Sequence, residues 1–323
     1  MFKGKKHPMV FDDKLKSELE KKFGNFVRFD VPMSSCTSLS IGGPADALAE
    51  PDTIDDLALC LKWVNEKKLP ATVIGSGTNL LVRDNGIRGV VITLKKMNSD
   101  MLVAHETREH VFFTAGAGRS LHSVVRYAID KGFSGLSFAI GIPGTVGGSI
   151  IMNAGTGKGT MGDVIDAVHI LSPDGNIKIL SRESLNFSYR HFDIRNKNGS
   201  TTRHAILIDA MFKLEKGDSD TLQKEADMIM SARKRTQPMN LKSAGCFFKN
   251  PDSGKSAGEL IDIAGLKGKK IGGAEVSTIH ANYFINAANA TASDMLELRD
   301  LVRQKVADTF GIYLEEEVRI IGE

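Results

Sequence analysis

Apolar residues recur at helical spacing early in the chain, where Leu57, Leu61 and Val64 fall on one face. A proline and cap-type residues precede this stretch, as they do at the start of helices. A short apolar run, Ala71–Ile74, follows, then the loop GSGTN and a second apolar run, Leu80–Val82. This order predicts a helix, a strand, a phosphate-sized loop and a strand, which is typical of an α+β nucleotide site.

A second unit of the same kind is predicted further along the chain. The run FFTAGAG predicts a strand, and Leu121, Val124, Val125 and Ala128 then recur at helical spacing. Ser120 stands where a helix cap is expected. Residues 167–180, AVHILSPDGNIKIL, predict a β-hairpin because a Pro-Asp-Gly turn separates two β-rich runs.

A domain boundary is predicted at residues 216–220, after a strand expected from His204 onward, because the composition there becomes polar. With 323 residues, the chain also exceeds the usual size of one domain. We expect a first domain over residues 1–216, with lobes of about 1–100 and 101–216, and a second domain over residues 217–323 that opens with an amphipathic surface helix.

Cap residues indicate further helices in the second domain. Ser256 and Glu259 form a capping-box pair before an apolar run, and Ser293 is the expected cap of a helix over residues 294–310. A final strand is predicted over residues 312–321, IYLEEEVRII. Its alternation would place Glu315 and Glu317 on one face and Glu316 on the other.

The composition is that of a soluble globular protein and excludes several classes of function. Hydrophobic residues make up 41% and charged residues 25%. The 42 basic and 39 acidic side chains are spread along the chain, so no nucleic-acid partner is expected. The cysteines form no CxxC pair and the histidines no HExxH motif, so neither a disulfide framework nor a metal site is expected.

Two further features bear on location. The charge-free stretch of residues 132–157 is long enough to span a bilayer, but its glycines and Pro143 would weaken a helix, so a buried, tightly turned loop is expected instead. The N-terminal run MFKGKKHPMVFDDKLK lacks the apolar stretch of a secretory signal. With an odd number of cysteines, these observations predict a cytoplasmic protein without membrane contact.

Two glycine-rich segments carry the candidate chemistry. In GSGTN, Gly75 and Gly77 let backbone amides approach an anion, and Thr78 and Asn79 add donors, as a pyrophosphate cradle requires; a tight turn is the alternative. The GxGxxG and Walker patterns do not match, which argues against a dinucleotide-type Rossmann fold and a P-loop NTPase. GIPGTVGGSIIMNAG is more specific, since glycines and a proline in an uncharged setting suggest backbone packed against a flat cofactor.

Six motifs together carry a family resemblance: VIGSGTNLLV, GIPGTVGGSIIMNAG, SYR, AGCFFKNP, IGGAEV and LEEEVRIIG. From about Ser40 to Gly322 the chain resembles the UDP-N-acetylenolpyruvoylglucosamine reductases. The resemblance implies an α+β fold, with a two-lobed FAD-binding domain of the vanillyl-alcohol oxidase (PCMH) type and a smaller α/β substrate-binding domain. It also implies that NADPH reduces noncovalent FAD, through which UDP-N-acetylglucosamine-enolpyruvate becomes UDP-N-acetylmuramate in peptidoglycan synthesis, without an obligate protein partner.

By this resemblance, the first glycine-rich segment holds the FAD pyrophosphate, and the second lines the flavin and its phosphates. The implied cofactor-binding residues are Gly75, Ser76, Gly77, Thr78, Asn79, Leu80, Gly141, Ile142, Pro143, Gly144, Thr145, Gly147, Gly148, Asn153, Ala154 and Gly155. The implied substrate-binding residues are Tyr189, Arg233, Lys249 and Asn250. The short segment between the SYR and AGCFFKNP motifs resembles the shorter (type II) branch of the family.

The family's three catalytic positions fall on Arg190, Cys246 and Glu317. Hydride transfer to an enolpyruvyl double bond puts negative charge on its carboxylate, which the guanidinium of Arg190 can stabilise. A proton must then reach the neighbouring carbon, and Cys246 is the candidate donor where the commonest family pattern has serine. Without their motifs, Cys246 would be read as a small buried hydrophobe and the other two as surface charges.

Two other functions stay open. A flavin oxidase of the same fold acting on an alcohol or hydroxy acid often carries a histidine for covalent flavin attachment, and neither glycine-rich segment has one. A non-catalytic nucleotide-sugar binder would result if cysteine in place of serine abolished turnover, although Arg190 and Glu317 are retained. His280 is expected to have a structural role.

Overall fold

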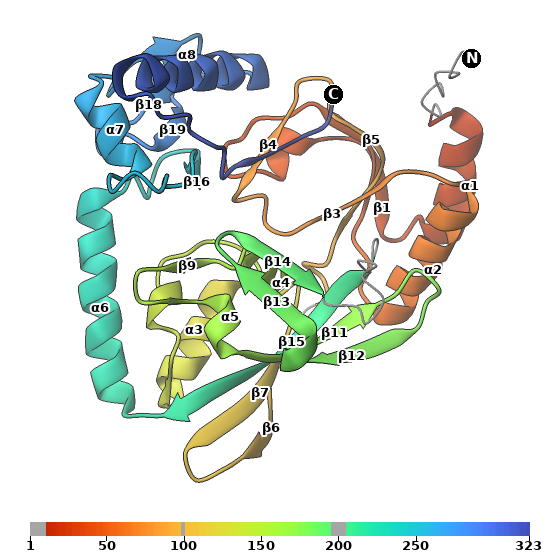
Figure 1. Cartoon of the computed structure of the whole chain (residues 1–323). Helices are drawn as coiled ribbons and strands as arrows, with labels where there is room; N and C mark the ends of the chain where they lie inside the picture. The colour runs from red at the N-terminus through yellow and green to blue at the C-terminus, as the bar shows by residue number, and fades with distance from the viewer. Residues whose placement is uncertain (1–10, 98–100, 195–204) are drawn as a thin grey trace, which may run out of the picture.

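The computed structural model describes residues 11–97, 101–194 and 205–323, which form three packed units (Figure 1). Residues 1–10 of the run considered for a secretory signal, and His204 at the expected start of a strand, lie outside the described residues. Among the helices of the described ranges, none is long and apolar enough to cross a bilayer.

The first lobe is a four-stranded sheet against which two helices pack. Its elements are α1 (Asp13–Phe23), β1 (Val27–Pro32), η1 (Met33–Ser35), β2 (Pro44–Ala49), α2 (Ile54–Glu66), β3 (Ala71–Ile74), β4 (Leu80–Val82) and β5 (Ile87–Thr93). The sheet order is β1-β2-β5-β3, and β5 is parallel to both β2 and β3. The predicted helix and strand are confirmed, because α2 buries Leu57, Leu61 and Val64 and is followed by β3.

The second lobe is built on an antiparallel sheet of order β12-β11-β15-β7-β6. Its elements are β6 (Leu102–Glu106), β7 (His110–Gly116), α3 (Leu121–Asp130), β8 (Phe133–Ser134), η2 (Ser137–Ala139), α4 (Val146–Ile151), β9 (Gly155–Thr156), β10 (Gly159–Thr160), α5 (Met161–Val164), β11 (Ile165–Leu171), β12 (Ile177–Ser181), η3 (Arg182–Ser184), β13 (Leu185–Ser188), β14 (His191–Ile194) and β15 (Ile206–Lys216). The predicted β7–α3 unit and the β11–β12 hairpin are confirmed.

Ser120 occupies the cap position of α3 as predicted, although its side chain makes no capping hydrogen bond. One expectation for this lobe was wrong. The charge-free segment contains the short helix α4 where only a loop was expected. Helix is possible there because Thr145 caps it, accepting from the Gly148 amide at 3.2 Å, and because Gly147 lets it approach Ala117 closely.

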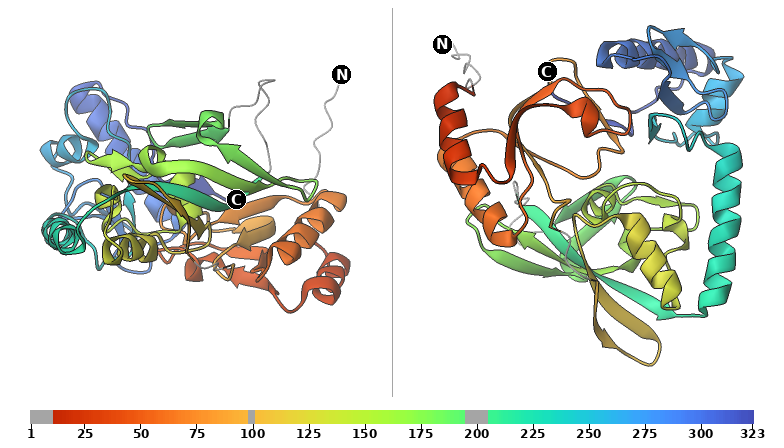
Figure 2. Two further views of the ribbon diagram at one scale, coloured as in Figure 1. Left: turned by 90° about the horizontal axis from the view of Figure 1, so that it is seen from below. Right: turned by 180° about the vertical axis from the view of Figure 1, so that it is seen from behind.

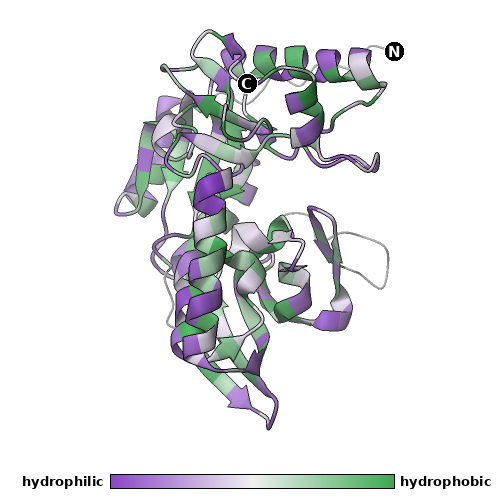
Figure 3. Cartoon of the chain, turned by 90° about the vertical axis from the view of Figure 1, so that its left-hand side faces the viewer, coloured by the Kyte–Doolittle hydropathy of each residue, from purple (hydrophilic) through white to green (hydrophobic). Residues whose placement is uncertain are grey.

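A single long helix, α6 (Ser219–Thr236), joins the second lobe to the C-terminal unit. It runs along one side of the molecule in Figure 1, and the rear view in Figure 2 shows the same arrangement. Hydrophilic residues dominate its outward face in Figure 3, and Ala226 is its buried residue. This is the surface helix predicted after the polar turn.

The C-terminal unit is a small sheet of order β16-β19-β18-β17 covered by helices. Its elements are β16 (Ser243–Cys246), α7 (Ala257–Ile263), β17 (Lys270–Ile271), β18 (Ala274–Val276), β19 (Tyr283–Asn286), α8 (Ala292–Phe310) and β20 (Arg319–Ile321). The capping box of Ser256 and Glu259 is confirmed. The cap of α8 is Thr291, in a capping box with Asp294, so the assignment to Ser293 was wrong.

Ser293 is instead bound by the first lobe, which explains why it is not the cap. The Asp84 carboxylate accepts hydrogen bonds from the Ala292 amide at 2.8 Å, the Ser293 amide at 2.9 Å and the Ser293 hydroxyl at 2.7 Å. The positive end of α8 favours this carboxylate. A side chain of the first lobe therefore fixes the start of a helix in the C-terminal unit.

The end of the predicted final strand also returns to the first lobe. Regular strand structure is limited to β20, which pairs in parallel with β4, so the predicted length of residues 312–321 was wrong. Leu39, Ile41 and Leu81 of the first lobe belong to the same buried core as α7 and α8. The first lobe and the C-terminal unit thus share a core and a strand pair.

Candidate active site

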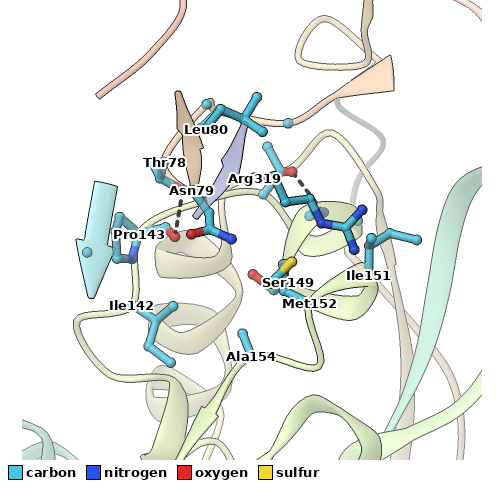
Figure 4. A pocket seen from close by; sticks show the side chains of 18 of the residues that line it. Thr78, Asn79, Leu80, Ile142, Pro143, Ser149, Ile151, Met152, Ala154 and Arg319 are labelled. Atoms are coloured by element: carbon cyan, nitrogen blue, oxygen red, sulfur yellow. Dashed lines mark hydrogen bonds between the residues drawn. The ribbon is translucent and has the colours of Figure 1, made fainter. Parts of the chain in front are cut away.

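A cavity of about 580 Å³ lies where the three units meet. Its walls come from the β3–β4 loop, the segment around α4, the tip of the β13–β14 hairpin, the end of α6 and the strands β16, β19 and β20. The volume is within the usual range for a site that encloses a small ligand or cofactor. Figure 4 shows side chains of two glycine-rich segments facing each other across it.

The first glycine-rich segment forms one wall, and all six predicted residues, Gly75 to Leu80, line the cavity. A Cβ on Gly75 would lie 2.5 Å from Oγ1 of Thr145, so only glycine fits there. Gly77 has a φ of +67°, which favours glycine. Gly75 is therefore needed for the backbone to pass this close to the second segment, and Gly77 for its close approach to Cys36 and Thr37.

The second segment faces the first, and the Thr78 hydroxyl joins them by donating to the Pro143 carbonyl at 3.2 Å (Figure 4). Eight of its ten predicted residues line the cavity: Ile142, Pro143, Gly144, Thr145, Gly147, Gly148, Ala154 and Gly155. Gly141 and Asn153 do not. Gly141 and Asn153 instead help to position Arg233 and Arg190, whose side chains line the cavity.

Gly141 makes room for Arg233, since a Cβ there would lie 2.8 Å from the Arg233 Nε. Asn153 is 5% exposed and fixes the chain around it. Its amide donates to the Ser188 carbonyl and its oxygen accepts from the Gly162 amide, both at 2.9 Å. Because Ser188 ends β13, this hydrogen bond anchors the hairpin that carries Arg190.

Arg190 lies in the tight turn between β13 and β14, with a φ of +56°. Its Nε is 2.7 Å from Oε1 of Glu317, and its Nη1 donates to the Gly155 carbonyl at 3.3 Å. The guanidinium also lies 5.3 Å from the centroid of the Tyr189 ring, within cation–π range. The hairpin tip therefore holds a positive charge at the cavity wall.

The three consecutive glutamates before β20 point to three different partners. Glu315 binds Lys249 at 3.2 Å, Glu316 binds Arg299 and Arg303, and Glu317 binds Arg190. The predicted alternation was wrong here, because the Glu315 side chain is 76% exposed and that of Glu317 only 14%. The segment is not a regular strand, so a period of two does not apply.

The main-chain groups of Glu317 are held in place by hydrogen bonds from two sides. Its amide donates to the Phe247 carbonyl at 2.8 Å, and the Asn79 side chain donates to its carbonyl at 3.1 Å. Burial raises the pKa of the Glu317 carboxyl, and the neighbouring charge of Arg190 opposes that rise. Asn79, predicted to bind cofactor, thus also connects the first glycine-rich segment to Glu317.

Cys246 ends β16, partly exposed to the cavity. Burial raises the pKa of its thiol to about 12, and the carboxylate of Glu317 adds to this while Arg190 and Arg233 oppose it. The group is therefore a neutral thiol at physiological pH. A neutral thiol can donate a proton, which is the role expected of Cys246 from the family resemblance. It is also a poor nucleophile.

The four predicted substrate-binding residues divide into two groups. Arg233 lines the cavity, whereas Tyr189, Lys249 and Asn250 do not. Asn250 donates its amide to the Tyr189 hydroxyl at 3.3 Å, and Lys249 pairs with Glu315. These three residues lie together outside the cavity. Tyr189 directly precedes Arg190 in the chain, and Lys249 and Asn250 follow shortly after Cys246.

The sequence did not identify about half of the lining residues. They are mostly apolar or small and are Val73, Ile74, Leu94, Ala117, Gly118, Ser149, Ile151, Met152, Thr156, Ala205, Ile206, Leu207, Gln237, Ala244, Gly245, Tyr283 and Arg319. The GAG at the end of β7 was a usable signal for Ala117 and Gly118, since it follows a strand as GSGTN does. No local signal marked Tyr283 or Gln237.

No histidine is among the described residues that line the cavity. Across the described ranges, no three His, Cys, Asp or Glu residues are grouped as metal ligands. His280 accepts a hydrogen bond from the Asn282 amide at 3.2 Å and packs against Tyr283. These contacts support the structural role expected of His280.

Both halves of the chain match models of known protein families. Residues 45–181 match an FAD-binding domain, and residues 237–321 match the C-terminal domain of UDP-N-acetylenolpyruvoylglucosamine reductase. The FAD-binding match covers the first glycine-rich segment and the second. The C-terminal match covers Cys246 and Glu317.

Relatives cover the chain almost completely. A UDP-N-acetylenolpyruvoylglucosamine reductase of Desulfosudis oleivorans is 44% identical over 97% of this chain and 100% of its own length. The enzyme of that name from Pelobacter propionicus is 41% identical over 91% and 95% of the two chains.

A solved structure agrees with these relatives. The crystal structure of the Thermus caldophilus reductase (MurB) is 34% identical, with a TM-score of 0.75, and covers 91% of this chain and 99% of its own. The predicted fold class is thus confirmed: an α+β protein with a two-lobed FAD-binding part of the vanillyl-alcohol oxidase type and a smaller C-terminal part. The chain belongs to the UDP-N-acetylenolpyruvoylglucosamine reductase family of FAD-dependent oxidoreductases.

Proposed function

We propose that this chain uses NADPH to reduce UDP-N-acetylglucosamine-enolpyruvate to UDP-N-acetylmuramate, a precursor of peptidoglycan. The observation that carries the proposal is the convergence of Arg190, Cys246 and Glu317 on a cavity walled by two glycine-rich segments. These groups come from three distant parts of the chain and supply a cation, a proton donor and a carboxylate. The names of the relatives support this choice of substrate.

The residues of the cavity fit noncovalent FAD. The loop from Gly75 to Leu80 offers backbone amides for the pyrophosphate, and side chains such as Ile142 and Leu207 offer apolar walls for a flat ring. The residues that line the cavity in the described part of the chain include no histidine, which supports a noncovalent flavin. When bound, the flavin supplies the hydride.

Arg190 and Cys246 have separate roles in this proposal. Arg190 binds the carboxylate of the enolpyruvyl group and stabilises the negative charge that gathers there as the double bond is reduced. Cys246 donates its thiol proton to the carbon next to that carboxylate. The pKa of about 12 keeps this proton on the thiol until the carbon becomes basic enough to take it.

Glu317 keeps Arg190 in position. The 2.7 Å ion pair fixes a guanidinium that belongs to a hairpin tip in the second lobe, while Glu317 itself is fixed by main-chain hydrogen bonds to the first lobe and the C-terminal unit. The pair thus joins all three units at the cavity. A small error in the placement of such groups lowers the rate strongly.

The nucleotide end of the substrate is proposed to reach from Arg233 in the cavity toward Tyr189, Lys249 and Asn250 outside it. Cationic and amide donors suit a diphosphate. The domain limits proposed with this assignment are residues 1–216 for FAD and 217–323 for the UDP-sugar. We also propose a cytoplasmic location, which the three unpaired cysteines support.

The proposal is tested by the colour of the purified protein. The yellow flavin should bleach with NADPH without oxygen and recover when UDP-N-acetylglucosamine-enolpyruvate is added. Bleaching of the oxidised flavin by an alcohol or hydroxy acid with recovery of colour in oxygen, or a flavin that stays with the acid-precipitated protein, would instead favour the oxidase. Binding of the UDP-sugar without recovery of colour would favour a non-catalytic binder.

A further inference from the structure

Tyr283 lines the cavity next to Cys246, and the roles assigned above do not use it. It is the first residue of β19 and stands opposite Cys246 in the antiparallel pair with β16. Directly opposed residues in an antiparallel pair project from the same face of the sheet. The phenol and the thiol therefore enter the cavity side by side.

The hydroxyl of Tyr283 lacks a protein partner. The residue is 9% exposed, and its ring centroid lies 4.9 Å from that of His280. Within the described residues, no hydrogen bond joins this hydroxyl to another group. The hydroxyl is therefore accessible from the cavity, where a bound ligand can accept its hydrogen bond.

The surroundings of Tyr283 make it a donor. Burial raises its pKa, the neighbouring Cys246 and Glu317 raise it further, and Arg233 opposes the rise. The phenol therefore stays protonated and can donate to an anion. It is also longer than the cysteine side chain, so its hydroxyl can reach farther from the sheet than Sγ can.

We propose that Tyr283 is a further catalytic residue, whose hydroxyl donates a hydrogen bond to the enolpyruvyl carboxylate beside the carbon that Cys246 protonates. This inference rests on the function proposed above. A reduced flavin bound in the cavity would supply a hydride to the methylene carbon, and the electron pair of the double bond would move toward the neighbouring carbon and its carboxylate. The S–H bond of Cys246 then breaks as a C–H bond forms at that carbon.

Tyr283 keeps its proton throughout these reaction steps. The carboxylate oxygen that it contacts gains negative charge as the double bond is reduced, so the hydrogen bond strengthens toward the transition state. Tyr283 then shares the carboxylate with Arg190, which approaches from the second lobe. Its loss should therefore affect the rate of substrate reduction more than the binding of substrate.

The test compares the two half-reactions in Tyr283→Phe, using the whole FAD-containing protein in anaerobic stopped flow. Bleaching by NADPH should stay within about 2-fold of the natural protein, since hydride transfer to flavin does not involve the carboxylate. Reoxidation by saturating UDP-N-acetylglucosamine-enolpyruvate should slow by about 10- to 100-fold, the usual effect of losing a hydrogen bond to a charged group. Calorimetric binding of the same compound to the oxidised protein should weaken by only a few fold.

Tyr127→Phe is the matched control, because it removes a hydroxyl from a tyrosine packed against Phe113 and Phe133 that does not line the cavity. It should leave both half-reactions unchanged. Reoxidation of Tyr283→Phe at the natural rate, or equal slowing of both half-reactions with loss of flavin, would overturn the inference. If the natural protein itself is not reoxidised by the UDP-sugar, the proposed function fails instead.

Discussion

Arg190 and Glu317 form an ion pair of 2.7 Å between the turn of a hairpin in the second lobe and the segment that precedes β20. Their side chains are 20% and 14% exposed, so both charges are largely removed from water. A buried charge without its partner is costly, so protonation of Glu317 would leave the charge of Arg190 unpaired. The pair therefore makes the cavity sensitive to pH.

The pH dependence should report Glu317. Burial raises the pKa of this carboxyl above its ordinary value of 4.5, so it takes up a proton earlier than other glutamates as the pH falls. Protonation removes the charge that holds Arg190, and reoxidation of the flavin by the UDP-sugar should slow as the pH falls through a value above 4.5. Stopped-flow rates across pH 4 to 8 measure this, with NADPH bleaching as the control. Glu317→Gln should lack this acid limb; an unchanged limb in that variant would assign it to another group.

Cys246 should act as a proton donor rather than as a nucleophile. Cys246→Ser keeps a protonated donor and should still turn over, whereas Cys246→Ala should bleach with NADPH and reoxidise with the UDP-sugar at least 100-fold more slowly, because general acid catalysis contributes about 10²- to 10⁴-fold. Flavin absorbance measures both steps. Turnover of the alanine variant at the natural rate would remove Cys246 from the mechanism.

The same thiol should be slow to alkylate. A pKa of about 12 leaves far less thiolate at pH 8 than the reference pKa of about 8.5 would, and the thiolate is the reactive form. Iodoacetamide should therefore label Cys246 about 10³-fold more slowly than the same thiol after denaturation. Mass spectrometry of the labelled peptides gives the rates, and fast labelling of Cys246 in the folded protein would contradict the neutral thiol.

The first glycine-rich segment should not tolerate a side chain at Gly75. A Cβ there would lie 2.5 Å from Oγ1 of Thr145. Relief of this clash would push apart the two glycine-rich segments that line the cavity. Gly75→Ala should lose most of its bound FAD, seen as a higher ratio of absorbance at 280 to 450 nm. Gly157→Ala is the control, since a Cβ there meets no atom within 4 Å. Normal flavin content in Gly75→Ala would show that this wall does not hold the cofactor.

Asp84 should stabilise the contact between the first lobe and α8. Burial acts to raise its pKa, but hydrogen bonds from Ser293 and Ala292 outweigh this and lower it. Asp84→Ala removes these three bonds at a helix start and should lower the free energy of unfolding by about 1 kcal/mol or more. Thermal melts measure this against Asp252→Ala, which changes an exposed aspartate. Equal melting temperatures would mean that the contact adds no stability.

Local patterns predicted the parts of the fold that depend on neighbouring residues. The spacing of Leu57, Leu61 and Val64 predicted α2 because a helix buries one face. The glycines of both segments predicted the cavity walls because close backbone approach excludes a Cβ. In each case the physical cause lies within a few residues of the signal.

The remaining features depend on contacts between distant residues. Glu315, Glu316 and Glu317 were expected to alternate, but their directions are set by basic partners elsewhere in the chain. No local pattern singles out Tyr283, and its register with Cys246 places it in the cavity. Neither the register nor the partners can be read from local sequence.

The pairing of β20 with β4 bears on how the protein is made. The two strands are far apart in the chain, and contacts of this kind form slowly because a long loop must close first. While a ribosome is still adding the residues before Arg319, β4 has an open edge that can pair with another chain. Glu317 lies shortly before β20, so the closing of this long loop also brings its carboxylate to Arg190 at the cavity wall.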